Sequence, residues 1–122
     1  MFKKVAFTMY PVIDLARAKT FYEETLGLPQ GKELVAGKWV EFDLPQGGCL
    51  ALTTMVPDLA PSSEAGGSLA FEVEDIHALT ETLKSKGVKF RMDLFESPVC
   101  HMAAALDSEG NSFMLHQLKN QD

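Results

Sequence analysis

The sequence predicts an α+β fold of two βαβββ modules, which form a curved mixed sheet around a cleft with the helices outside. Several short segments alternate apolar and polar residues, as half-buried strands do. Two segments that each follow an aspartate carry apolar residues at helical spacing. The same order of elements occurs in both halves of the chain, and one such unit alone would leave a face of its sheet uncovered. Two modules are therefore expected to pair.

The first module is expected at about residues 3–55. Residues 3–10 alternate as a strand does, and Pro11 is expected to break its ladder. Asp14 is suited to cap the N-terminus of a helix over residues 15–26. Further strands are expected at residues 30–36, 39–44 and 49–54.

A linker at about residues 56–67 is rich in proline, serine and glycine, and a second module is expected at about residues 68–119. This module opens with a strand at residues 68–74. Asp75 then caps a helix, which Gly87 ends. The remaining strands are expected at residues 88–95, 99–106 and 112–118.

The two halves match at three places, where the offsets are 61, 60 and 63 residues. The matching pairs are Val12-Ile13-Asp14-Leu15 with Val73-Glu74-Asp75-Ile76, Gly27-Leu28 with Gly87-Val88, and residues 47–53 with residues 110–116. The match aligns the last strand of the first module with the last strand of the second module, residue by residue. Corresponding side chains should therefore point toward the same face of their sheets.

Composition narrows the class of protein. The chain has 122 residues, 46% hydrophobic and 23% charged, which suits a single globular domain spanning 1–122. A formal net charge of −6 argues against nucleic acid or an anionic membrane as a partner. No apolar run approaches the ~18 residues of a transmembrane helix, and the N-terminus lacks the features of a signal peptide. We therefore expect a cytoplasmic protein in which Cys49 and Cys100 are reduced thiols.

Three segments, read in order, carry a family resemblance. "PVIDLARAKTFYEETLGL" opens the first module, "LAFEVEDIHAL" opens the second, and "DSEGNSFMLHQ" closes the chain. In a doubled βαβββ frame they resemble the vicinal oxygen chelate superfamily, which includes glyoxalases, bleomycin-resistance proteins and extradiol dioxygenases. The resemblance implies the glyoxalase-like fold and, by analogy, a homodimer. The modules could pair within one chain or by exchange between two.

Metal-dependent members of that superfamily bind one divalent cation through His, Gln or Glu side chains from four strands. The resemblance places those positions on Phe7, Ala51, Ser68 and Met114. None of these side chains is a plausible ligand for a hard or borderline cation. We therefore expect no metal and no cofactor.

Strand parity predicts what lines the cleft instead, because residues two apart point the same way. The predicted ligand-binding residues are Phe7, Met9, Thr53, Ser68, Glu72, Met114 and His116. An apolar surface with a few polar groups is typical of a small-molecule site. The alternative is that Phe7 and Met114 simply fill the space that metal and substrate would occupy.

His116 is the only candidate for a catalytic residue, since an imidazole with a pKa of ~6.5 suits proton transfer. The alternative is a strand histidine bonded to Glu72 or to a backbone carbonyl. Cys100 and His101 are adjacent in a strand, so their side chains should point to opposite faces and not form a nucleophile pair. His77, in the first turn of a helix, is expected to face solvent.

Three functional hypotheses follow. The first is a metal-free, small-molecule-binding protein of the glyoxalase/bleomycin-resistance type. The second is a glyoxalase-like lyase, isomerase or dioxygenase with a non-standard site that uses His116. The third is a structural dimer with a filled cleft. They differ in what the cleft holds: a ligand, a reacting substrate, or the protein's own side chains.

Overall fold

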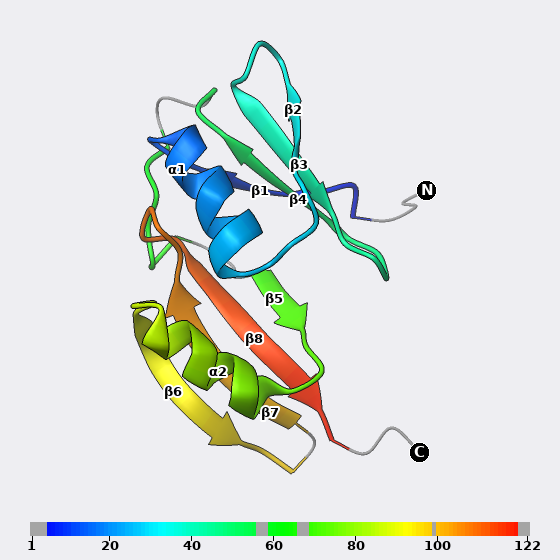
Figure 1. Cartoon of the computed structure of the whole chain (residues 1–122), viewed down its shortest axis with the longest axis vertical. Coiled ribbons are helices and arrows are strands. Elements are labelled where there is room, and N and C mark those ends of the chain that lie inside the picture. Colours follow the sequence, from blue (N-terminus) through cyan, green and yellow to red (C-terminus); the bar gives the residue numbers. More distant parts are fainter. Residues whose placement is uncertain (1–4, 56–58, 66–68, 99, 120–122) are drawn as a thin grey trace. The chain divides into compact units, whose positions relative to one another are not determined.

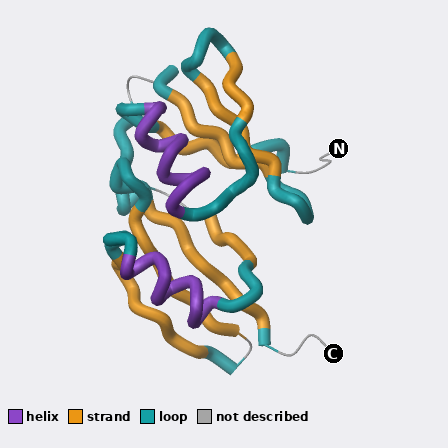
Figure 2. The backbone as a smooth tube through the Cα atoms, in the orientation of Figure 1, coloured by secondary structure: helices purple, strands orange, loops and turns teal. Residues whose placement is uncertain are grey.

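The computed structural model describes residues 5–55, 59–65, 69–98 and 100–119. The chain divides into two compact units, Met1–Pro61 and Ser62–Asp122. Each unit contains a four-stranded mixed sheet, and helix lies against one face of that sheet (Figure 1). The described residues 59–65, which lie between β4 and β5 in the sequence, form neither helix nor strand (Figure 2).

The first unit has the strand order β1-β4-β3-β2, with β1 parallel to β4 and the other neighbours antiparallel. Its elements are β1 (Thr8–Pro11), α1 (Leu15–Thr20), the π-helix η1 (Phe21–Thr25), β2 (Lys32–Leu34), β3 (Trp39–Asp43) and β4 (Cys49–Thr53).

The second unit repeats this topology with the order β5-β8-β7-β6, and β5 is parallel to β8. Its elements are β5 (Leu69–Glu72), α2 (Ile76–Ser85), β6 (Phe90–Glu96), β7 (Cys100–Leu106) and β8 (Ser112–Leu118). The predicted α+β class and doubled βαβββ order are confirmed. Within the described ranges, no helix has the length and apolar character needed to cross a membrane.

Both predicted helix caps are present. Asp14 Oδ1 accepts a hydrogen bond from the Arg17 amide at 3.0 Å, and Asp75 Oδ1 accepts one from the Ala78 amide at 3.1 Å. Each carboxylate thereby satisfies an amide that the helix itself leaves unpaired. These local bonds explain why the helix starts could be predicted from sequence.

The first helix differs from the prediction in its second half. Residues 15–26 do not form one α-helix, because the chain widens into η1, where the Leu26 amide donates to the Phe21 carbonyl at 3.0 Å. Two aromatic residues follow each other at this point, and the Phe21 and Tyr22 rings lie edge to face with centroids 5.4 Å apart. Tyr22 is fully buried against Phe42, with ring centroids 5.8 Å apart.

The first strand also differs from the prediction. It runs over Thr8–Pro11, so Pro11 ends the strand inside its ladder, paired with Thr53, and does not break it. The reason is that β1 lies at the edge of its sheet, where a residue without an N–H is tolerated. The ladder continues beyond the proline, since the Val12 amide donates to the Thr53 carbonyl at 2.9 Å.

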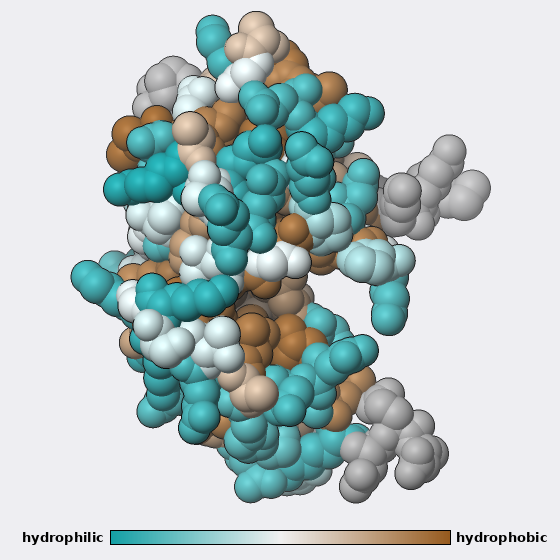
Figure 3. All heavy atoms as spheres, in the orientation of Figure 1, coloured by the Kyte–Doolittle hydropathy of each residue, from teal (hydrophilic) through white to brown (hydrophobic). Residues whose placement is uncertain are grey.

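Each unit buries its own core between helix and sheet. The buried side chains of the first core include Tyr22, Val40, Phe42, Leu50 and Leu52, and those of the second include Phe71, Ile76, Leu83, Phe113 and Leu115. The outer surfaces of α1 and α2 carry mostly hydrophilic side chains (Figure 3). Below, the opposite side of each sheet is called its helix-distal face.

Candidate functional site

The helix-distal face of the first sheet can be read from its register. Met9 pairs with Ala51 in β4, while Glu41 and Trp39 of β3 pair with Ala51 and Thr53. Directly paired residues lie on the same face of a sheet. These five side chains therefore share the face opposite to the buried core.

An aromatic pair lies at this face. Phe7, just before β1, contacts Trp39 edge to face, with ring centroids 5.3 Å apart and an interplanar angle of 87°. The indole Nε1 of Trp39 donates to Glu41 Oε2 at 2.9 Å, which fixes the orientation of the ring. Phe7 remains 43% exposed. Sequence reasoning did not assign Trp39 to the site, although the alternation in residues 39–44 already put it opposite the core residues.

Thr53 shares this face but is fully buried. Its hydroxyl donates to the Lys38 carbonyl at 2.9 Å and accepts from the Met55 amide at 2.9 Å. The hydroxyl therefore ties the end of β4 to the start of β3.

The helix-distal face of the second sheet is set by two paired positions, Ala70 with Met114 and Glu72 with His116. Met102 of β7 pairs with His116 from the other side. Met114 and His116 are half-buried. Ser68, the remaining predicted residue of this module, lies outside the described residues.

Glu72 and His116 form a hydrogen-bonded pair, with His116 Nδ1 and Glu72 Oε1 2.5 Å apart. The other carboxylate oxygen of Glu72 accepts from the Leu118 amide at 3.0 Å. Glu72 thus holds one ring nitrogen, while Nε2 has no hydrogen-bond partner among the described residues. A histidine oriented by a carboxylate can accept a proton or a hydrogen bond at its second nitrogen.

The same contacts lower the pKa of Glu72. The hydrogen bond from His116 has the largest effect, followed by the Leu118 amide, and both stabilise the charged carboxylate. Because the folded-state pKa lies below the ordinary value of 4.5, Glu72 adds stability above pH 4.5. That contribution is lost as the pH falls through the folded-state value.

We expect Glu72→Gln to lower the free energy of unfolding at pH 7 by less than about 1 kcal/mol, since the Glu72 side chain is mostly exposed. Urea unfolding of both proteins between pH 7 and pH 3 measures this. The difference between wild type and variant should shrink below about pH 4.5. A difference that grows with acidity would contradict the assigned bond.

The residues on which the family resemblance places the metal ligands do not fit a divalent cation in this chain. Phe7 and Ala51 have no donor atom, and Met114 offers a thioether, which suits soft metals. Among the described residues, no group of three or more His, Cys, Asp or Glu side chains could hold a metal ion. No chemistry is therefore assigned to a metal at these positions.

The remaining histidines lie on the helix-covered side of the second sheet. Cys100 pairs with Leu118 and His101 with Gln117, so the side chains of Cys100 and His101 point to opposite faces. His77 is exposed, but its ring also lies 4.9 Å from that of His101, a contact the sequence did not indicate.

Comparison with known proteins agrees with this fold. The profile of the Glyoxalase/Bleomycin resistance protein/Dioxygenase superfamily matches residues 4–115. The uncharacterized protein YetH of Bacillus subtilis (strain 168) is 28% identical over 96% of this chain and 100% of its own length.

Solved structures show the same fold. TnmS3, an antibiotic binding protein from Streptomyces sp. CB03234, is 25% identical, with a TM-score of 0.78 over 97% of this chain and 98% of its own. A glyoxalase/dioxygenase from Nostoc punctiforme is 18% identical, with a TM-score of 0.80 over 97% and 92%. With its doubled βαβββ topology and a profile match over most of its length, the chain belongs to the glyoxalase/bleomycin resistance/dioxygenase superfamily.

Proposed function

We propose that this chain is a metal-free protein that binds an organic ligand with apolar or aromatic parts, in the manner of bleomycin-resistance-type members of its family. The observation that carries the proposal is the Phe7–Trp39 pair on the helix-distal face of the first sheet. The family resemblance places one of the metal-ligand positions on Phe7. The proposed contacts are Phe7, Met9 and Trp39 on the helix-distal face of the first unit, and Glu72, Met114 and His116 on the helix-distal face of the second unit.

The chemistry of these side chains favours a ligand over a reaction at a metal. Aromatic rings offer flat apolar area and stack on a ligand ring, which is worth about 0.5–1.5 kcal/mol beyond burial. Methionines such as Met9 and Met114 adapt to irregular ligand shapes. On the second unit, the Glu72–His116 pair offers a polar group to a ligand through Nε2 of the imidazole. Thr53 is left out of the proposed contacts because its hydroxyl is already hydrogen-bonded to the Lys38 carbonyl and the Met55 amide.

The relatives add support in one respect. TnmS3 is described as an antibiotic binding protein, and its likeness to this chain extends over nearly the full length of both. A net charge of −6 is compatible with a ligand that carries a positive group.

The test uses the fluorescence of Trp39, the single tryptophan of the chain. The protein is titrated with a panel of aromatic and apolar compounds, neutral and cationic. A bound compound should change the emission of Trp39 in a saturable way. It should also stabilise the fold by about 2.7 kcal/mol when present at 100 times its Kd. If no compound produces either effect, the proposal is wrong.

Phe7→Ala should weaken binding of such a compound at least about tenfold, a loss of ~1.4 kcal/mol. The unfolding free energy should change by less than about 1 kcal/mol, because the ring is already half-exposed. Ile13→Ala is the control, since Ile13 is 78% exposed and does not belong to the proposed site. Equal affinities of Phe7→Ala and wild type would remove Phe7 from the site.

A second candidate function is general-base catalysis of the lyase, isomerase or dioxygenase kind, and the orientation of His116 by Glu72 favours it. Here His116→Ala would abolish turnover of a substrate while the unfolding midpoint stays near wild type. Turnover that survives this substitution would exclude His116 as the base.

The proposal also includes a cytoplasmic homodimer, as the family resemblance implies. Light scattering after gel filtration should give twice the 13.4 kDa of one chain. A mass of one chain at micromolar concentration would contradict it.

A further inference from the structure

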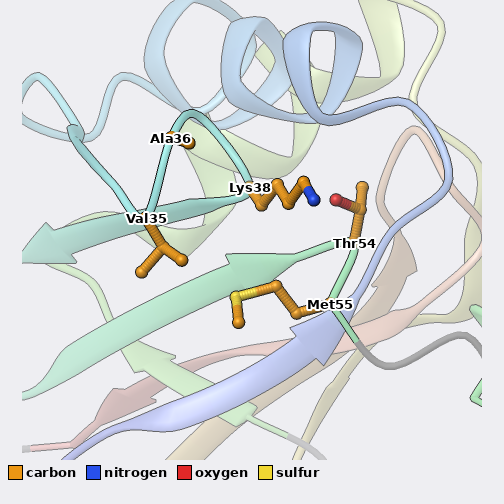
Figure 4. Close-up of a pocket in the computed structure, with 5 residues that line it drawn as sticks. All are labelled: Val35, Ala36, Lys38, Thr54 and Met55. Atoms are coloured by element: carbon orange, nitrogen blue, oxygen red, sulfur yellow. The ribbon is translucent and has the colours of Figure 1, made fainter.

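A cavity lies at the end of the β2–β3 hairpin in the first unit. Its volume is about 450 Å³, and it is lined by Val35, Ala36, Lys38, Thr54 and Met55 (Figure 4). The Lys38 and Thr54 side chains point toward one another in this view. None of the five belongs to the ligand site proposed above.

The cavity combines a cation with exposed apolar surface. The Lys38 ammonium has no carboxylate partner within the described part of the chain, and the hydroxyl of Thr54 has no hydrogen-bond partner there. Val35 and Met55 are 54% and 46% exposed, which is high for large apolar side chains. A charged group beside two apolar side chains matches a ligand that has both an anionic and an apolar part.

The turn that forms one wall is strained. Val35 and Ala36 both have a φ of 53°, and Gly37 follows with a φ of 76°. Residues with a side chain avoid this left-handed region, and a β-branched valine is an outlier there. A glycine or asparagine would adopt the same backbone at lower cost. The strained turn nevertheless presents the apolar Val35 side chain to the cavity, and backbone strain of this kind concentrates at functional sites.

We propose that this cavity binds a small carboxylate with an apolar tail. The carboxylate would bind Lys38 Nζ and the Thr54 hydroxyl, and the tail would contact Val35 and Met55. Glu33, in the same hairpin, is paired with Lys19 at 3.3 Å. The acidic net charge of the protein opposes approach of an anion, so binding should be modest, with a Kd of about 1 mM.

The probe is hexanoate, and its neutral isostere hexanamide is the matched control. Hexanoate should shift the backbone amide resonances of residues 34–38 and 54–55 in a saturable ¹H–¹⁵N titration. Hexanamide should bind at least about fivefold more weakly, because it lacks the charge that Lys38 recognises. Equal affinities of the two compounds, or shifts centred elsewhere in the chain, would overturn the proposal.

Three variants separate binding from folding. Lys38→Met keeps the length of the side chain and should weaken hexanoate binding about tenfold, while Lys38→Arg should stay within about threefold of wild type. Val35→Asn should relieve the turn and raise the melting temperature, yet weaken hexanoate binding several-fold. A purely structural role for Val35 would not give these opposite effects. Retained hexanoate affinity in Lys38→Met would overturn the site.

The two binding proposals can fail independently. Phe7→Ala should leave hexanoate binding unchanged, and Lys38→Met should leave binding of an aromatic compound unchanged. If either variant lost binding of both hexanoate and the aromatic compound, the two ligands would share one site, which would contradict a separate carboxylate site.

Discussion

Asp107→Ala is expected to lower the free energy of unfolding by about 2–4 kcal/mol. Asp107 is buried in the turn that leads into β8. Its Oδ1 accepts from the Glu109 amide at 2.8 Å and from the Asn111 amide at 2.9 Å, and Oδ2 accepts from the Asn111 side chain at 3.2 Å. Alanine would remove the acceptor of all three hydrogen bonds.

Urea denaturation at pH 7 measures the change. Asp107→Asn should lie between wild type and Asp107→Ala, because an amide oxygen can still accept one or two of the same bonds. Ser108→Ala, at the neighbouring position of the turn, is the control and should cost less than about 0.5 kcal/mol. If Asp107→Ala proved as stable as that control, the hydrogen bonds assigned to the carboxylate would contribute little.

Phe113→Ala should cost about 3–5 kcal/mol, because it deletes a fully buried ring from the centre of the second core. Phe113 packs against Phe71, with ring centroids 6.0 Å apart. From its place in β8, it pairs with Leu69 of β5 and with Ala105 of β7. Two neighbouring strands, β5 and β7, therefore lose contacts at once.

Thermal and urea unfolding test this expectation. The adjacent Met114→Ala is the control, since Met114 is half-buried and points to the helix-distal face. It should cost clearly less than Phe113→Ala. Equal losses at the two positions would contradict the assignment of the two faces of β8.

The elements could be predicted because their determinants are local. Asp14 and Asp75 each form the capping bond that their sequence contexts indicated. Parity along residues 112–118 also separated Met114 and His116 from the buried Phe113 and Leu115, since parity needs no knowledge of the neighbouring strand. The position of Pro11 in β1 could not be foreseen, because its tolerance depends on β1 being an edge strand.

The contacts of the candidate site were less accessible from sequence. The Glu72–His116 bond was named as one alternative, and the register Glu72↔His116 is what brings the two side chains together. The Phe7–Trp39 pair joins residues far apart in the chain through β4, so no single segment contains the pattern. The sequence did not indicate the left-handed turn at Val35, because valine normally avoids a positive φ.

The parallel pairing of β1 with β4, and of β5 with β8, has a kinetic consequence. In each unit the last three strands, β2–β4 or β6–β8, form an antiparallel meander from consecutive segments. The parallel pair joins the first strand of the unit to its last strand. Closing such a long loop is entropically costly and slows folding. The meander should therefore form early in the folding transition state, and the edge strand with its helix should dock late. Substitutions at Met9 should then change mainly the unfolding rate, and substitutions at Phe42 the folding rate.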